Sequence, residues 1–325
     1  MAIRQLLFNT LHRFGATAYL RRDKKDKLTI ISLHRITTES DPFFEPIRPA
    51  AFDELLGYLK RHYTIVGFGD VPALKAGMKK PPLILSFDDG YYDFVEYAMP
   101  ILEKHGVRAN HNIVNACAAG TALIWTERLN HLFNHCRLNG LDLSFEEEGL
   151  PYSIKGSNGN WMDFNLKVFL ALLQLDRSKR LPLIDRKEAQ YGTRAERRMM
   201  HWDEVRQCAD AGIEIGNHTY THDVMSTIAD AATMRHEIGD ARREMEAQIG
   251  RPVNILALPN GQGNPLVDAA VAEAGYDCLL YVGNRVNGLR PEGAAPHIFW
   301  RVGVNHEPLP ETALRIELFH SKIRN

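Results

Sequence analysis

Short apolar runs alternate with amphipathic segments along most of the chain. Residues 28–34 and 83–87 are continuous enough in apolar character to predict buried strands, while residues 50–61 repeat their apolar positions at helical spacing and predict a helix. Strands and helices that alternate in this way are typical of a parallel α/β architecture. Further strands are predicted at residues 109–114, 213–215 and 254–258.

Two further patterns refine this prediction. A helix is expected after Gly90 as far as about His105, with Gly106 as its C-terminal cap. Five apolar side chains recur at helical spacing later in the chain, which predicts a face buried in the core and not a cofactor site. They are Met234, Ile238, Ala241, Met245 and Ile249.

The alternation is interrupted between about residues 120 and 198. This stretch contains helical pieces at residues 127–137 and 163–173 around a Gly/Ser/Asn-rich loop. We interpret it as an insertion that shapes the substrate groove of one main domain, residues 28–305. Residues 1–27 form a basic N-terminal segment, and residues 306–325 a C-terminal helix or tail.

Composition excludes several classes of protein. The 325 residues are 45% hydrophobic and 24% charged, with a formal net charge of −1, so no overall field favours nucleic acid. Four scattered cysteines argue against a disulfide framework or a cysteine-built zinc site and fit a reducing compartment. No run approaches a membrane span, and we find no secretory signal. We therefore expect a cytoplasmic protein.

The N-terminal segment leaves two interpretations open. Its first residues are weakly amphipathic, and five basic residues follow between Arg21 and Lys27. This pattern fits a solvated tail or leading helix. It also fits a light, peripheral contact with an anionic membrane surface.

Polar residues with catalytic potential follow three of the predicted strands. Asp88 and Asp89 end a buried strand, where two carboxylates need a cation or hydrogen-bond donors; an acidic first turn of a helix is the alternative. His218 and His222 are spaced to share a metal, although this spacing also arises by chance. One carboxylate with two imidazoles is a usual open zinc set. The third segment, residues 258–263, can present a backbone N–H or be a plain turn.

In combination, these three segments resemble a known family. Leu-Ser-Phe-Asp-Asp-Gly, His-Thr-Tyr-Thr-His and Leu-Pro-Asn-Gly occur in the order and approximate spacing of the polysaccharide deacetylases, the NodB-homology or carbohydrate esterase family 4 group. The resemblance covers about residues 28–304. It implies a distorted (β/α)7-type barrel with a helical insertion, and a hydrolase acting on carbon–nitrogen bonds other than peptide bonds. The implied reaction is removal of an N-acetyl group from a sugar of a cell-surface glycan or its precursor.

The resemblance also implies roles for individual residues. Asp89, His218 and His222 would bind a divalent metal, most often Zn²⁺, with Co²⁺, Ni²⁺ or Mn²⁺ as alternatives. Asp88 would be the general base. The backbone N–H of Asn260 would stabilise the oxyanion.

Two positions depart from the usual pattern of the family. The late Leu-x-His motif that usually supplies the general acid is missing, and His34, at the end of the first strand, takes that role in our hypothesis. This arrangement resembles circularly permuted members. Ala257 stands where an arginine usually orients the base; Arg301 is the candidate substitute, with an ordinary salt bridge as the alternative.

The substrate is expected to be an N-acetylated sugar. Tyr91, Trp125 and Trp202 are candidates for stacking on a sugar ring, each also explained as a core or hinge residue, and Pro259 is a candidate contact. Two alternatives to the deacetylase hypothesis remain. One is an inactive glycan-binding protein on the same fold, and the other is a deformylase or O-acetyl esterase of a lipid-linked sugar.

Overall fold

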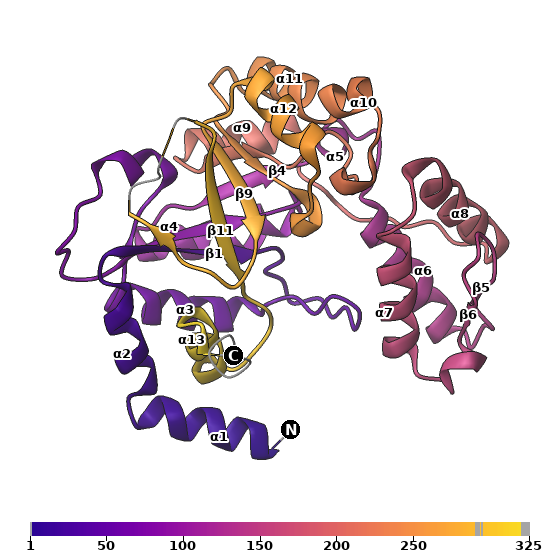
Figure 1. Ribbon diagram of the computed structural model, residues 1–325. Helices are drawn as coiled ribbons and strands as arrows, with labels where there is room; N and C mark the ends of the chain where they lie inside the picture. Colours follow the sequence, from indigo (N-terminus) through magenta and orange to yellow (C-terminus); the bar gives the residue numbers. More distant parts are fainter. Residues whose placement is uncertain (1, 290–292, 294, 320–325) are drawn as a thin grey trace.

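Seven parallel strands close into a barrel in the computed structural model, which describes residues 2–289, 293 and 295–319 (Figure 1). The strands lie side by side in chain order, and the last pairs with the first to complete the ring. They are β1 (Lys27–Leu33), β3 (Pro82–Phe87), β4 (Asn110–Ile113), β7 (Glu214–Asn217), β8 (Ile255–Ala257), β9 (Cys278–Val282) and β11 (His297–Gly303). The predicted (β/α)7-type barrel is thus confirmed.

The apolar runs of the sequence become strands that are buried on both faces. All six residues of β3 and the last six of β1 are buried, as expected for parallel strands covered by helices. Two short strands extend the sheet at its margins, namely β2 (Thr64–Ile65) beside β3 and β10 (Asn287–Gly288) antiparallel to β1. Strand β9 was not predicted from the sequence, although its residues are apolar, and neither was β11, whose apolar run is interrupted by Arg301.

Helices cover the outside of the barrel (Figure 1). Gly106 caps α4 in the left-handed region at φ 62°, as predicted, and the five predicted core residues between 234 and 249 are all buried. The helices are α3 (Pro49–His62), η2 (Phe68–Ala73), η3 (Phe94–Ala98), α4 (Met99–His105), α5 (Asn115–Ala118), α9 (Trp202–Asp210), η5 (Met225–Thr227), α10 (Ala231–Arg235), η6 (His236–Asp240), α11 (Ala241–Ile249), η7 (Pro259–Gly261) and α12 (Pro265–Ala274).

The barrel interior changes from apolar to polar along its axis. Side chains of a strand alternate between its two faces, so residues of one parity point inward. In the lower part, the buried residues Leu28, Ile84 and Phe299 pack together with η2. Farther toward the carboxyl ends, inward positions hold buried Ser86 and Arg301 instead. The polar end of the interior therefore lies where the candidate catalytic residues follow the strands.

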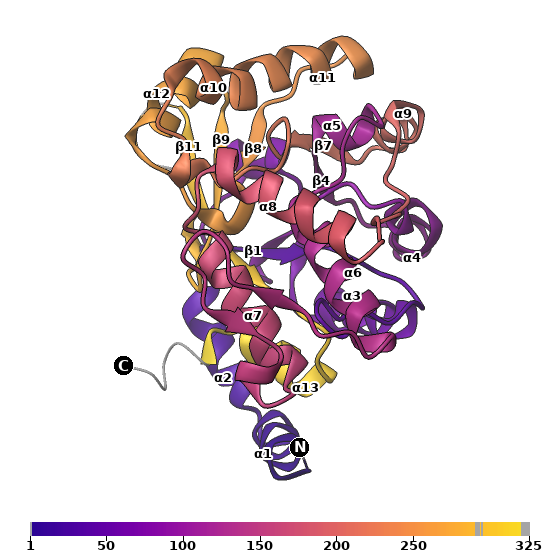
Figure 2. The ribbon, with the colours of Figure 1, turned by 90° about the vertical axis from the view of Figure 1, so that its right-hand side faces the viewer.

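The segment between α5 and α9 forms a lobe beside the barrel, at the right in Figure 1 and facing the viewer in Figure 2. It has its own apolar core, in which Phe133 contacts Phe145 and Phe164. Since it leaves the barrel after β4 and α5, it stands on the side of the carboxyl ends of the strands. Its elements are α6 (Trp125–Leu138), β5 (Ser144–Phe145), β6 (Tyr152–Ser153), η4 (Lys155–Ser157), α7 (Trp161–Leu172) and α8 (Arg177–Gln190).

The two ends of the chain pack against each other below the barrel in the view of Figure 1. The N-terminal part consists of α1 (Ala2–Arg13), α2 (Ala16–Arg21) and η1 (Arg22–Lys24). They pack on α13 (Leu309–Ile316), where Arg21 forms an ion pair with Glu317 at 2.8 Å.

Candidate active site

The loops after β3, β7 and β8 carry the candidate residues in a rarely used backbone conformation. Asp89, Thr219, His222 and Asn260 have φ angles of 79°, 67°, 61° and 56°. Each such residue other than glycine costs on the order of 1–3 kcal/mol and persists only where its surroundings hold it. Four of them in these loops indicate that the backbone is shaped to aim particular side chains.

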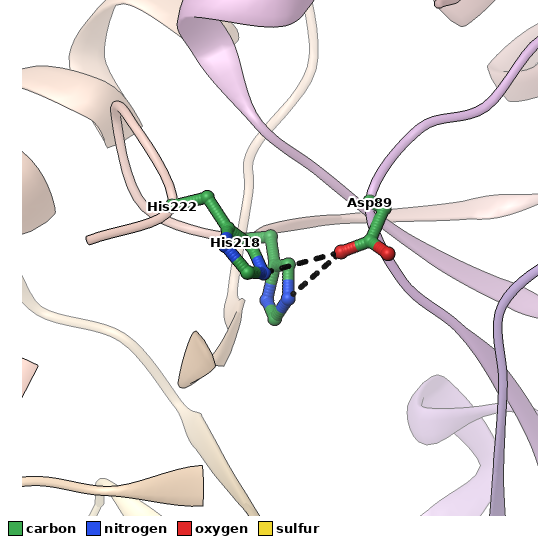
Figure 3. A group of neighbouring side chains, drawn as sticks. All are labelled: Asp89, His218 and His222. Atoms are coloured by element: carbon green, nitrogen blue, oxygen red, sulfur yellow. Dashed lines mark ion pairs between the residues drawn. The ribbon is translucent and has the colours of Figure 1, made fainter. Parts of the chain in front are cut away.

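Asp89, His218 and His222 converge on one point (Figure 3). Asp89 Oδ1 lies 3.4 Å from Nε2 of His218 and 3.3 Å from Nε2 of His222. All three side chains are buried, and Asp89 Oδ1 has no hydrogen-bond partner in the part of the chain that the structure describes. A buried carboxylate oxygen that faces two imidazole nitrogens fits a divalent cation, because carboxylate and imidazole are usual zinc ligands.

The ring of His218 is fixed by the strand next to its own. Its Nδ1 donates a hydrogen bond of 2.8 Å to the carbonyl of Ala257, so the proton belongs on Nδ1 and the lone pair of Nε2 faces Asp89. In the loop that follows, Thr219 Oγ1 accepts a hydrogen bond from the backbone N–H of His222 at 3.1 Å. A hydrogen bond therefore fixes the ring of His218, whereas at His222 it fixes the backbone only, since Nδ1 of that ring has no partner among the described residues.

Asp88 has a different set of partners from its neighbour Asp89. Arg301 Nη1 and Asn112 Nδ2 both donate to Asp88 Oδ1, at 2.7 Å each. Burial alone would raise the pKa of the Asp88 carboxyl, but Arg301, His218 and His34 together bring it below its ordinary value. Asp88 is therefore an ionised carboxylate whose second oxygen, Oδ2, accepts no bond from either donor.

His34 lies on the side of that second oxygen. Its Nε2 is 4.0 Å from Asp88 Oδ2, and its side chain is 33% exposed. Phe44 packs edge-on against the imidazole, with ring centroids 5.2 Å apart. The structure therefore brings the predicted acid to the predicted base, with one face of the imidazole open to solvent.

The loop after β8 contributes Pro259 and Asn260. Pro259 is buried, and η7 turns at Asn260 with its positive φ. Gly261 makes the turn feasible, because a Cβ at this position would lie 2.8 Å from the backbone nitrogen of Val282. The backbone that bears the Asn260 N–H is thus tightly constrained.

The aromatic residues expected to stack on a sugar ring are largely buried. Tyr91 and Trp125 are each 2% exposed; Tyr91 donates a hydrogen bond to Glu127, and Trp125 stacks on Phe169 with centroids 5.7 Å apart. Burial of this extent does not support the expected stacking on a sugar ring. Trp202 is partly buried and packs against the main core.

A cavity of about 910 Å³ lies between the lobe and the barrel. Arg177 and Trp125 line it from the lobe, and Thr221 and Asp223, on either side of His222, line it from the barrel. Arg180 of α8, itself fully buried, holds Asp223 at 2.7 Å. The lobe is therefore tied directly to the loop of the second histidine.

Sequence reasoning missed Asn112 and the pair Arg180–Asp223. A signal for Asn112 was present, because Asn110, His111 and Asn112 put three polar residues into a strand that is wholly buried. Gly216 is part of the same arrangement: a Cβ there would lie 2.1 Å from Asn112 Oδ1.

Sequence comparison connects this geometry with a known family. Residues 185–279 match the family model described as polysaccharide deacetylase. This confirms the resemblance to the polysaccharide deacetylases. The matched part contains His218, His222 and Asn260, and the enzyme class predicted from the sequence, a hydrolase of carbon–nitrogen bonds, is the class of this family. A comparison with curated protein sequences gives no match.

Solved structures of deacetylases share the fold. The Streptococcus pyogenes deacetylase PplD in complex with acetate aligns at a TM-score of 0.59 and 15% identity, over 90% of this chain and 98% of that one. IcaB from Ammonifex degensii aligns at 0.57 and 17%, over 90% and 97%. A de-N-acetylase from Aggregatibacter actinomycetemcomitans aligns at 0.51 and 15%, over 85% and 94%.

Proposed function

We propose that this protein is a metal-dependent deacetylase that removes an N-acetyl group from a sugar of a glycan or glycan precursor. The observation that carries the proposal is that two adjacent carboxylates have different partners. Asp88 is held by an arginine and an amide, whereas Asp89 faces two imidazoles, and its Oδ1 has no hydrogen-bond partner among the residues that the structure describes. Such a pair supplies a base and a metal ligand at one strand end.

Asp89, His218 and His222 would hold the divalent ion, with Zn²⁺ favoured by the donor set and Co²⁺, Ni²⁺ or Mn²⁺ as alternatives. When bound, such an ion polarises an acyl carbonyl and lowers the pKa of a water. The hydrogen bond from His218 to Ala257 keeps the ligand nitrogen aimed at this point.

Proton transfer is assigned to Asp88 and His34. Asp88 Oδ2 accepts the proton of the attacking water, because Oδ1 is already bound by two donors. His34, 4.0 Å from Oδ2, donates a proton to the nitrogen of the departing amine. Its partial exposure lets it regain a proton from solvent. The backbone N–H of Asn260 is assigned to the oxyanion.

The substrate is assigned to the groove between the barrel and the lobe. The cavity there is lined by Thr221 and Asp223, the neighbours of His222, although His222 and Asp89 themselves do not line it. A sugar bound in the cavity would thus lie beside the ion site and extend toward it. We place the substrate in cell-surface glycan biosynthesis, as a glycan or a precursor of one.

The decisive experiment combines metal analysis with acetate release from a panel of N-acetylated sugars. We expect about one divalent ion per chain and acetate release that a chelator abolishes. Asp88→Asn should keep the ion and lose turnover by about 10²–10⁴-fold, the usual contribution of a general base. Asp203→Asn, which changes a carboxylate with 88% side-chain exposure, is the matched control and should behave as the parent protein.

The same experiment separates the alternatives. An inactive glycan-binding protein would release no acetate from any sugar and would bind glycan equally well with Asn at position 88. A deformylase would release formate, and an O-acetyl esterase would act on ester-linked but not amide-linked acetate. Each of these results would overturn the N-deacetylase proposal.

A further inference from the structure

The first helix of the protein has two apolar faces, and only one of them is used. On the inner face, Phe8 is buried and packs edge-on against Phe319, with ring centroids 6.4 Å apart. Arg4 forms an ion pair with Glu311 of α13. The helix is thus fixed to the body of the protein by this side.

The other face of α1 points to solvent although it is apolar. Leu6, Leu7 and Phe14 are 67%, 53% and 83% exposed. Phe14 follows the last residue of α1, and its backbone N–H still bonds to the carbonyl of Thr10 at 2.9 Å. It lies seven positions after Leu7, close to two full turns, and Leu6 precedes Leu7 by one position, so the three side chains project within an arc of about 100°. Leaving three large apolar side chains in water on one face is costly, which marks the face as a contact surface.

Charge identifies the kind of surface that would cover this face. Residues 1–27 contain seven basic and two acidic residues, a net charge of +5, whereas the whole chain carries −1. Four exposed cations in this segment form no ion pair with any residue in the described ranges. They are Arg13, Arg22, Lys25 and Lys27.

We propose that α1 docks the protein on an anionic lipid surface. The exposed side chains Leu6, Leu7 and Phe14 would enter the interfacial region, and the basic residues that follow would lie among the lipid headgroups. An apolar face and a cluster of cations together give stable peripheral binding where either one alone is weak. A second copy of the chain fits less well, since the four unpaired cations of each segment would repel those of the other.

The docking would be peripheral. Among the described residues, no helix combines the length and the apolar character that crossing a membrane requires. In Figure 1, α1 projects from the end of the molecule below the barrel, so it can meet a surface without disturbing the catalytic loops.

A second exposed apolar stripe provides an internal comparison. Met162, Leu166 and Leu170 of α7 are spaced four residues apart and are 52%, 54% and 51% exposed. The only cation on α7, Lys167, is paired with Asp163 at 2.6 Å. This stripe matches the exposed face of α1 in apolar character but has no counterpart to the unpaired cations of residues 13–27, so we expect it not to dock on lipid.

The test is co-sedimentation of the full chain with vesicles of phosphatidylcholine alone or mixed with phosphatidylserine. We expect binding to the mixed vesicles only, weakened by salt. The variant Leu6→Ser/Leu7→Ser/Phe14→Ser and the variant Arg13→Gln/Arg22→Gln/Lys25→Gln/Lys27→Gln should each lose at least about tenfold in affinity. The control variant Met162→Ser/Leu166→Ser/Leu170→Ser should bind as the parent does.

Circular dichroism and thermal melting would establish that each variant remains folded, and the inner face with Phe8 is left intact in all of them. Equal binding by the α1 variants and the parent would overturn the proposal, as would loss of binding in the α7 variant alone. The proposal would also be overturned if the parent protein sedimented with no vesicle. The same holds if the parent protein were a dimer and the Leu6→Ser/Leu7→Ser/Phe14→Ser variant a monomer.

Membrane docking has a consequence for the substrate, and this step rests on the proposed function. A deacetylase held at a lipid surface would meet lipid-linked sugars in preference to free ones. Vesicle binding by the inactive Asp88→Asn variant separates the docking proposal from the deacetylase proposal. This variant should lose acetate release but still bind the vesicles.

Discussion

Arg301 and Asn112 donate hydrogen bonds to the same carboxylate oxygen, Oδ1 of Asp88, at 2.7 Å each. They reach it from opposite directions, since Asn112 belongs to β4 and Arg301 to β11. The carboxylate is therefore fixed in rotation, and Oδ2 remains available on the side of His34. We expect this arrangement to orient Asp88 as an arginine at position 257, where this chain has alanine, would orient it.

Replacement of Arg301 tests this arrangement electrostatically. Arg301 stabilises the ionised form of Asp88 and helps to hold the pKa of its carboxyl below the ordinary value. Arg301→Gln should therefore raise that pKa. The acid limb of kcat/KM should consequently move to higher pH, and kcat should fall by about 10–100-fold. Measuring the pH profile of the metal-loaded enzyme checks this. An unchanged acid limb would show that Arg301 is a structural ion pair only.

Replacement of Gly216 tests the role of Asn112 through steric contact. A Cβ at position 216 would lie 2.1 Å from Asn112 Oδ1 and push the amide away from Asp88. Gly216→Ala and Asn112→Ala should each lower kcat by about 10–100-fold with little change in KM. The double variant should lose little more than either single one, because both remove the same hydrogen bond. Fully additive losses would contradict this coupling.

Replacement of His34 tests the assignment of the general acid. An amine must be protonated as it leaves, whereas a nitrophenolate leaves without help. His34→Gln should therefore lose about 10²–10⁴-fold on an N-acetyl sugar and much less on 4-nitrophenyl acetate. Equal losses on both substrates would assign His34 to a step before departure of the leaving group.

The candidate metal ligands predict which variants should lose the bound ion. Because Asp89 and His222 each supply one donor, Asp89→Ala and His222→Ala should lower the bound ion far below one per chain. His236→Ala, which changes an exposed histidine paired with Asp240, should retain it. Elemental analysis after dialysis against a weak chelator measures this. Full occupancy in the His222 variant would remove that residue from the ligand set.

The lobe should contribute to the stability of the catalytic loop. Arg180 is fully buried and pairs with Asp223, one residue after His222. Arg180→Met leaves that buried carboxylate with Arg177, 3.3 Å away, as its remaining cation, so the free energy of unfolding should fall by about 1–3 kcal/mol. Arg186→Met, on the exposed side of the same helix, should change it little. Chemical denaturation of both variants provides the comparison.

Local signals in the sequence determined much of this protein. The run that forms β3 is apolar except for Ser86 and is followed directly by Asp88. His218 and His222 are four positions apart in a single loop, so their spacing is visible in the sequence. The core stripe between residues 234 and 249 also follows from periodicity alone. These features depend on neighbours in the chain, where the period of a strand or helix decides which side a residue faces.

Only the tertiary structure decided which distant residues meet. Arg301 reaches Asp88 across 213 positions because β11 pairs with β1, and β1 with β3, in a fixed register. Trp125 and Tyr91 are covered by packing that composition does not reveal. Sequence periodicity specifies the inward face of each strand, but the partner on that face is set by closure of the barrel, where the register of all seven strands is fixed together.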